Sequence, residues 1–133
     1  MYEIRPENKA GVSFSIRRGR LLVYHATIKA LDNPSYIRFL VNSNEQHLAV
    51  QCCEEIDGNH FRVPVPKEGE KYIFEISSVT FLSILYKMCK WDQAKTYMVY
   101  GAVHPKYRLV DFDLKNAREI RPDQFVDPEN ITY

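Results

Sequence analysis

Three arginines surround one glycine near the N-terminus, in the stretch "SIRRGRLLVYH" at residues 15–25. A guanidinium presents its N–H donors in a planar fork, so Arg17, Arg18 and Arg20 are suited to bind phosphate oxygens or base edges. The same arginines suit a solvated hairpin tip, because charged tips discourage pairing with other chains. The stretch therefore predicts a contact site for DNA or for a protein, or a turn that the arginines keep in water.

Four other side chains would extend this contact site if the fold places them beside the turn. Lys29 and Arg38 would add positive charge, and Tyr24 and Tyr36 would offer rings on which bases stack. The whole chain has a net charge of only +1, so no global field draws it onto DNA or an anionic membrane. The first 40 residues hold seven basic and three acidic side chains, and the next 40 hold three and seven. The expected site is therefore a local basic patch.

The cysteines, histidines and carboxylates form no recognisable catalytic or metal-binding motif. The three cysteines are an odd number without C-x-x-C spacing, which fits a reducing cytoplasm better than a disulfide framework. We expect Cys52 and Cys89 to lie in the core, Asp111 and Asp113 on the wet face of a strand, and His47 in a solvated turn. The prediction is no metal, no cofactor and no catalytic residue. An enzyme stays open as an alternative, because catalytic partners need only be close in space.

Apolar periodicity predicts one α+β domain over residues 1–121, mainly β, with about seven strands and two helices. A hairpin is expected around Gly19 and a second one around the polar turn at 42–46. The amphipathic helix begins at Val79, with Ser77 or Ser78 as its N-cap. The expected strands are 12–16, 21–25, 35–42, 47–53, 72–76, 95–103 and 109–114, the expected helices are 26–33 and 79–90, and the segment 122–133 is expected to be a loosely held tail.

Residues 12–53 and 71–114 follow the same order of elements, which suggests an internal repeat. Within each, a strand leads to a helix and then to a hairpin. A shift of 62 residues aligns apolar residues of the two hairpins, namely Ile37, Val41, Leu48, Val50 and Cys52 with Val99, Val103, Val110, Phe112 and Leu114. Two interpretations remain open: a duplicated βαββ unit, or a non-repetitive domain with two similar hairpins.

The stretch "GRLLVYHATIKALDN…YIRFLVNSNEQHLAVQ" resembles the AbrB/MraZ type of swapped-hairpin module. The resemblance is carried by Gly19-Arg20 opening a strand, by Leu31 near the end of a short helix, and by the hairpin at 37–50. It implies a homodimer that contacts DNA through the arginine-bearing loop.

The order of "FSI", "ATIKAL", "PSYIRFLVN", "LAVQC" and the later "KWD" resembles short uncharacterised proteins of Firmicute phages and mobile elements. That resemblance implies a role in mobile-element regulation or in blocking host defence. The N-terminus has no apolar signal region, and no apolar run is long enough for a membrane span, so we expect a cytoplasmic protein. The expected function is that of a non-enzymatic binding protein, namely a small DNA-associated regulator or, alternatively, an inhibitor or adaptor that binds a host protein.

Overall fold

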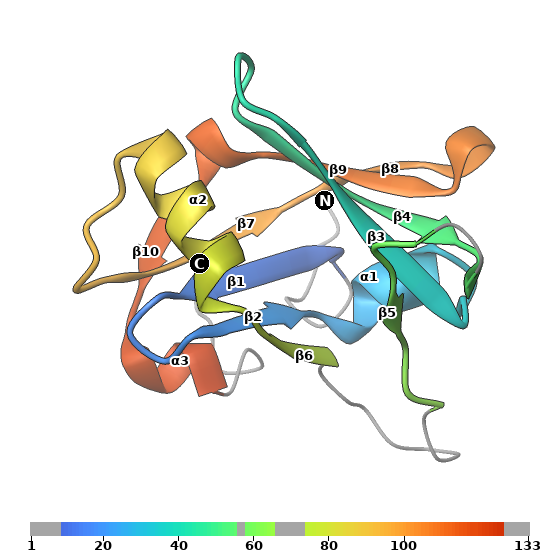
Figure 1. The fold of residues 1–133 in the computed structure, drawn as a ribbon, viewed down its shortest axis with the longest axis horizontal. Helices are drawn as coiled ribbons and strands as arrows, with labels where there is room; N and C mark the ends of the chain where they lie inside the picture. The colour runs from blue at the N-terminus through green and yellow to red at the C-terminus, as the bar shows by residue number, and fades with distance from the viewer. Residues whose placement is uncertain (1–8, 56–57, 66–73, 127–133) are drawn as a thin grey trace, which may run out of the picture.

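The computed structural model describes residues 9–55, 58–65 and 74–126. Within these ranges the chain forms two antiparallel sheets of five strands each, in the orders β10-β7-β1-β2-β6 and β5-β3-β4-β9-β8 (Figure 1). The strands are β1 (Gly11–Ser15), β2 (Arg20–Val23), β3 (Tyr36–Asn42), β4 (His47–Cys53), β5 (Phe61–Arg62), β6 (Phe74–Ser77), β7 (Thr96–Tyr100), β8 (Ala102–His104), β9 (Leu109–Asp113) and β10 (Arg118–Ile120). The helices are α1 (His25–Ala30), α2 (Val79–Cys89) and α3 (Pro122–Val126), with short 3-10 turns η3 (Pro105–Tyr107) and η4 (Leu114–Asn116) on either side of β9. The prediction of a mainly β, α+β fold is confirmed.

The arginine stretch forms the tip of the first hairpin. Gly19 has a φ of +65°, a conformation that glycine adopts at little cost, and its N–H donates to the carbonyl of Ile16 at 3.1 Å. A Cβ at this position would also come within 2.9 Å of Val79 Cγ2. The tip is held against the start of α2, because the Ser78 N–H donates to the Gly19 carbonyl at 3.2 Å. The loop is therefore a fixed platform for its arginines.

The main core lies between the two sheets, and α1 and α2 add apolar side chains to it. Alternate residues along each strand point inward, as the period of an extended chain requires. The sheets contribute Val12, Phe14, Leu21, Val23, Ile76, Val99, Ile37, Leu48, Val50, Val110 and Phe112, and the helices contribute Ile28, Leu31, Leu82, Leu85 and Tyr86.

Gly101 is the point at which the chain passes from the first sheet to the second. The segment 95–103 was expected to be one strand, but the structure divides it into β7 in the first sheet and β8 in the second. A Cβ on Gly101 would lie 2.6 Å from the Phe112 ring and 2.7 Å from Val110 Cγ1. Only glycine leaves room for this close crossing. The alternation of apolar residues continues through the crossing, so it did not predict the change of sheet.

The prediction of a loosely held tail is wrong for residues 122–126. These residues form α3, and Phe125 is only 2% exposed. It packs on the outer face of the first sheet with Leu22, Tyr24, Met98 and Ile120. Strand β10 pairs with β7 and brings α3 onto this face. Residues 127–133 lie outside the described residues.

The two hairpins of the second sheet have matching registers. Val41 pairs with Leu48 in β3–β4, and Val103 pairs with Val110 in β8–β9, in agreement with the 62-residue shift. Where β4 meets β9, Ala49 pairs with Asp111, and these two positions are themselves equivalent under the shift. A local two-fold axis therefore passes between Ala49 and Asp111. The equivalence ends at Gly101, because the 62-residue shift pairs Ile37 with Val99, and Ile37 lies in the second sheet whereas Val99 lies in the first. A true duplication therefore stays a prediction.

Tyr86 on α2 provides a test of the core at alkaline pH. Its buried hydroxyl lies 2.7 Å from the Lys95 carbonyl oxygen and 3.1 Å from that of Phe14, and burial raises its pKa from 10.0 to about 12. The unfolded chain therefore ionises this phenol first, so the stability it contributes is complete below about pH 10 and is lost as the pH rises towards about 12.

We expect Tyr86→Phe to cost about 1 kcal/mol of unfolding free energy at neutral pH, because the hydrogen bond is lost. The difference between wild type and variant should shrink when urea unfolding is repeated at about pH 11. Wild type and variant differ only in this hydroxyl, so the comparison isolates its contribution. A difference that stays constant with pH would contradict the assignment.

Candidate functional site

The structure places the three arginines of the first hairpin together, and among the described residues only Arg20 forms an ion pair with an acidic group. Arg17 and Arg18 are exposed, and Arg18 lies over the Phe125 ring at 5.3 Å from its centroid. Arg20 forms an ion pair with Glu75 at 2.7 Å across the β2–β6 pair. Two guanidiniums are therefore available to a ligand at this tip.

The other expected contact residues lie elsewhere. In Figure 1 the β1–β2 tip is at the left and α1, which carries the exposed Lys29, is at the right, separated by the length of β2, about 13 Å. Arg38 lies in the second sheet, where its Nε and Nη2 donate to Gln51 Oε1 at 3.0 and 2.8 Å. Tyr36 packs edge-on against His60, with ring centroids 5.1 Å apart. These residues do not form one basic patch with the tip.

Tyr24 is buried, contrary to expectation. It was expected to offer its ring to a base, but it is only 3% exposed and packs in the small core beneath α3. The sequence pattern placed it at the end of a strand, where either face was possible. Its ring lies against Gly11, where an added Cβ would come within 2.7 Å of Tyr24 Cδ2.

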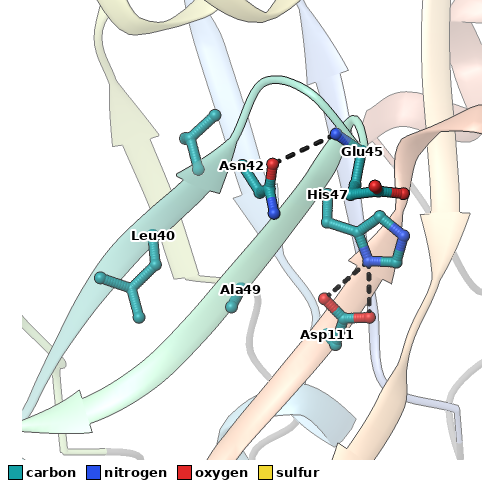
Figure 2. A pocket seen from close by; sticks show the side chains of 7 residues that line it. Leu40, Asn42, Glu45, His47, Ala49 and Asp111 are labelled. Atoms are coloured by element: carbon teal, nitrogen blue, oxygen red, sulfur yellow. Dashed lines mark hydrogen bonds and ion pairs between the residues drawn. The ribbon is translucent and has the colours of Figure 1, made fainter.

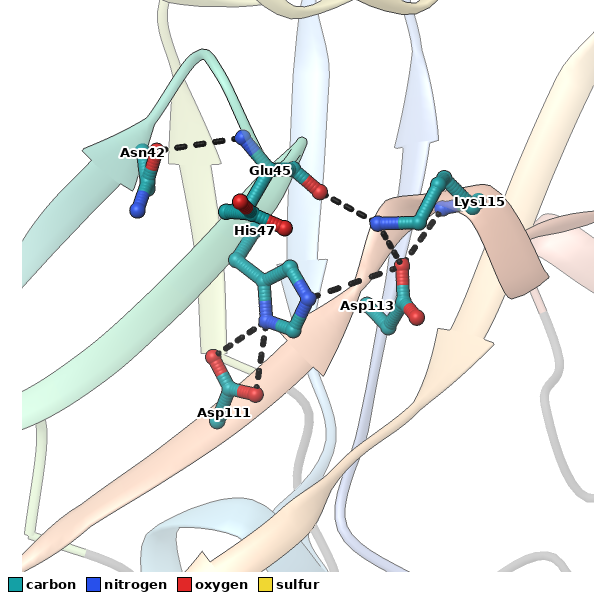
Figure 3. A network of polar contacts seen from close by, with 6 residues as sticks. All are labelled: Asn42, Glu45, His47, Asp111, Asp113 and Lys115. Carbon is teal, nitrogen blue, oxygen red and sulfur yellow. Dashed lines mark hydrogen bonds and ion pairs between the residues drawn. The ribbon is translucent and has the colours of Figure 1, made fainter.

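A polar network on the outer face of the second sheet was missed by sequence reasoning (Figure 3). His47 Nδ1 lies 2.8 and 3.0 Å from the two carboxylate oxygens of Asp111, a residue 64 positions away. The opposite ring nitrogen, Nε2, faces Asp113 Oδ1 at 3.8 Å. Asp111 and Asp113 lie on the solvent-exposed face of a strand, as expected. His47, which was expected in a solvated turn, lies in β4 and contacts both carboxylates.

Lys115 joins this network to the turn between β3 and β4. Its ammonium lies 3.0 Å from Asp113 Oδ1 and also donates to the main-chain carbonyl of Glu45. The Glu45 N–H in turn donates to Asn42 Oδ1 at 3.1 Å. The hydrogen bond from the Lys115 side chain, more than any other cause, lowers the pKa of Asp113 below its usual value. Asp113 therefore stays ionised at neutral pH.

Beside the network lies a shallow pocket of about 360 Å³ on the same face (Figure 2). Leu40 and Ala49 give it an apolar side, while Glu45, His47 and Asp111 give it a polar one. The lining contains two carboxylates, from Glu45 and Asp111, and one imidazole, from His47. It therefore carries at least one net negative charge whenever both carboxylates are ionised. The remaining lining residues are Val41 and Asn42.

The local two-fold axis relates two members of this polar cluster to apolar residues. The position equivalent to His47 is Leu109, and the position equivalent to Asp111 is Ala49. The same backbone geometry is thus formed with apolar residues on the other side of the axis. Since packing does not demand an imidazole and a carboxylate here, we take this side of the face as the candidate functional site.

The geometry of the site favours binding over catalysis. Both ring nitrogens of His47 face carboxylates, so neither is directed into the open pocket to take a proton from a substrate. Cys89 is no activated nucleophile, because burial raises the pKa of its thiol. In the part of the chain that the structure describes, no group of three or more His, Cys, Asp or Glu side chains could hold a metal ion.

Among the described residues, no helix has the length and apolar character that crossing a membrane requires. In comparisons with known proteins, no family model, no curated protein and no solved structure matched the chain. The resemblances to the swapped-hairpin modules and to phage proteins therefore stay predictions.

Proposed function

We propose that this is a non-enzymatic binding protein that contacts a partner protein through the outer face of its second sheet. The observation that carries the proposal is that no helix of the described chain covers this face, whereas α3 covers the corresponding face of the first sheet (Figure 1). The outward side chains of β3, β4, β8 and β9 are all partly or fully exposed. The bare face thus offers a contact area with a pocket in it.

The composition of this face suits a protein partner. Leu40 is 42% exposed and lies in one cross-strand row with Ala49, Asp111 and Ala102, so an apolar stretch at Leu40 and Ala49 borders a carboxylate. Glu45 and Asp111 make the pocket acidic. A fitting partner therefore presents an apolar side chain to Leu40 and a lysine or arginine to the pocket.

Nucleic acid is the second candidate partner, and the arginine tip is the observation in its favour. Only Arg17 and Arg18 are available there for phosphates, because Arg20 is paired with Glu75. Two phosphate contacts give a slope of about −2 for log K against log salt, against −5 or steeper for proteins that make six or more contacts. An inhibitor or adaptor is therefore better supported than a DNA-associated regulator.

The biological setting in this proposal comes from the resemblance to mobile-element proteins, namely a phage or mobile-element protein that binds a host factor. A cytoplasmic location belongs to the same proposal, and it fits the three free thiols Cys52, Cys53 and Cys89.

Substitution of Leu40 tests the proposed face. We expect Leu40→Asp to abolish recovery of a partner protein from nuclease-treated host lysate, because a carboxylate would replace the apolar centre beside an acidic pocket. Ile84→Asp is the matched control, since Ile84 is 53% exposed on α2, away from this face. The same partner should be recovered with wild type and with Ile84→Asp. Equal recovery with Leu40→Asp would refute the proposed surface.

The nucleic-acid alternative is tested at the tip. We expect wild type to shift mixed-sequence duplex DNA only at low salt, with a slope of about −2, and Arg17→Ala/Arg18→Ala to lose this shift. A wild-type slope of about −6 or steeper in fluorescence anisotropy would instead favour a DNA-associated regulator.

A further inference from the structure

We infer that an extended segment of a partner protein adds a strand to the second sheet along the open edge of β3, which consists of residues 39–42. This inference rests on the proposed function for the kind of partner, a protein, and adds how that partner is held. It is carried by main-chain groups that face no other described strand and by the side chains beside them.

Strand β5 covers only the first part of the outer edge of β3, where it pairs with residues 36–37. The Val63 N–H donates to the Ser35 carbonyl at 2.8 Å. Successive residues of an antiparallel strand turn their N–H and C=O groups to opposite edges, so every second residue after Ser35 faces this same edge. Phe39 and Val41 are two of them, and among the described residues no strand lies beside them there. Their N–H and C=O groups are therefore open to an added strand.

The side chains of the open edge are apolar on both faces of the sheet. Leu40 points outward, whereas Val41 points to the core side together with Leu48, the residue opposite it. Leu48 is fully buried, yet Val41 is 41% exposed, and in Figure 1 the tip of the β3–β4 hairpin projects beyond the other strands. Consecutive residues of an added strand also point to opposite faces. A partner segment with a run of consecutive apolar residues would therefore cover both side chains.

Three of the other edge strands carry charged side chains, which discourage an added strand. These are Glu75 on β6, Arg118 and Glu119 on β10, and Arg62 on β5, which Pro64 follows closely. The open edge of β3 has neither a charged residue nor a proline. Natural edge strands are normally protected in one of these ways, so an unprotected one indicates that pairing with another chain is used.

Strand β8 is the remaining edge, and it offers less for pairing. Its register with β9, and that of β9 with β4, leave only Val103 with its main chain turned outward. On one side the Gly101 N–H already donates to the Ala10 carbonyl at 3.0 Å, and on the other side Pro105 has no N–H. Val103 is thus a matched control for Val41, because the two valines are equivalent under the local two-fold axis.

The main chain of the open edge selects an extended backbone as its occupant. A row of N–H and C=O groups is satisfied by another strand, as β5 already does on the same edge. A second copy of β3 could offer only its own residues 39–42, because β5 covers the start of its edge. A segment of a partner protein has no such limit, and its residue opposite Leu40 would lie beside the acidic pocket that Leu40 lines.

Hydrogen exchange of the free protein, followed by NMR, tests whether the edge is open. We expect the amides of Phe39 and Val41 to exchange at least about tenfold faster than those of Arg38 and Leu40, whose main chain faces β4. Equally slow exchange at all four amides would show that the edge is already covered, and would overturn the inference.

The synthetic peptide Lys-Thr-Val-Ile-Val-Thr-Lys serves as the probe for the partner's segment. Saturation with this peptide should slow exchange at Phe39 and Val41 and leave Val103 unchanged. Two versions of the peptide, N-methylated at one or the other set of alternate amides, provide the matched control. Only the version methylated on the amides that face β3 should lose binding. If the two versions behaved alike, or if exchange at Phe39 and Val41 were not slowed, no strand would be added here.

Val41→Pro removes an N–H of the open edge, and Val103→Pro removes the equivalent N–H of β8. We expect Val41→Pro to weaken peptide binding by about tenfold and to abolish recovery of a partner protein, and Val103→Pro to change neither. Both variants should keep the circular dichroism of wild type, because proline is tolerated where an edge N–H faces away from the sheet. Val41→Lys keeps the main chain and adds a charge to the edge, so it should give the same loss if Val41→Pro fails to fold. Unchanged binding by the folded Val41 variants would refute the inference.

Three further results separate this inference from its alternatives and from the proposed function. A concentration-dependent dimer of wild type that Val41→Pro abolishes would place a second copy on the edge and refute a partner segment. If the peptide fails to slow exchange while Leu40→Asp still abolishes partner recovery, the added strand is refuted and the binding face stands. If the peptide slows exchange at Phe39 and Val41 while Leu40→Asp leaves partner recovery unchanged, the binding face is refuted and the added strand stands.

Discussion

Gly101→Val is expected to lower the free energy of unfolding by about 3 kcal/mol, because it overpacks the core. The chain crosses from the first sheet to the second at this residue, directly over Phe112 and Val110, which are both fully buried. The first added carbon would already lie 2.6 Å from the Phe112 ring, well inside van der Waals contact, and the two methyl groups of valine would require more room. The core must then shift, or the two sheets must separate locally.

Urea unfolding monitored by circular dichroism measures this effect, and Ala102→Val is the matched control. Ala102 is the next residue, it is exposed, and the added carbons there point away from the core. We expect the control to change stability by no more than about 0.5 kcal/mol. If the two variants were equally stable, the close crossing at Gly101 would be disproved.

Thr27→Val is expected to cost about 2 kcal/mol although it changes the side-chain volume very little. Thr27 lies on α1, is fully buried, and ties the helix to the first residue of β1. Its hydroxyl accepts from the Gly11 N–H at 2.7 Å and donates to the Gly11 carbonyl at 2.8 Å. In the valine variant a methyl group faces the Gly11 N–H, and a buried donor without a partner is costly.

Thr27→Ser distinguishes the hydrogen bonds from the packing. Serine keeps the hydroxyl and loses one methyl group, so we expect a loss of only about 1 kcal/mol. Thermal unfolding of the three proteins should therefore rank wild type first, serine second and valine last. If valine were as stable as serine or more so, the hydroxyl would not be what holds α1 to β1.

Local chemistry made several elements predictable from sequence. The first hairpin required only alternating apolar residues and a glycine able to adopt a positive φ at position 19. The main helix required a 3.6-residue apolar pattern and an N-cap, and Ser78 Oγ does accept from the Phe81 N–H at 3.2 Å. Because such signals act within a few residues, they can be read before the fold is known.

The candidate site could not be found in this way. His47 and Asp111 come together because β4 pairs with β9, and no local pattern states which strands become neighbours. For the same reason the arginine tip, Lys29 and Arg38 appeared able to form one patch, although the fold separates them. A register that places an imidazole opposite two carboxylates is a property of the sheet.

The sequence by itself determined the class of fold, the tip that Gly19 turns and the amphipathic helix, because each depends on interactions between residues near in the chain. Tertiary structure alone decided that the chain changes sheets at Gly101, that α3 buries Phe125 on the first sheet, and that no helix of the described residues covers the outer face of the second sheet. These features depend on contacts between segments that are distant in sequence, so they are settled only when the two sheets pack. The bare face and its polar cluster, on which the proposed function rests, belong to this second group.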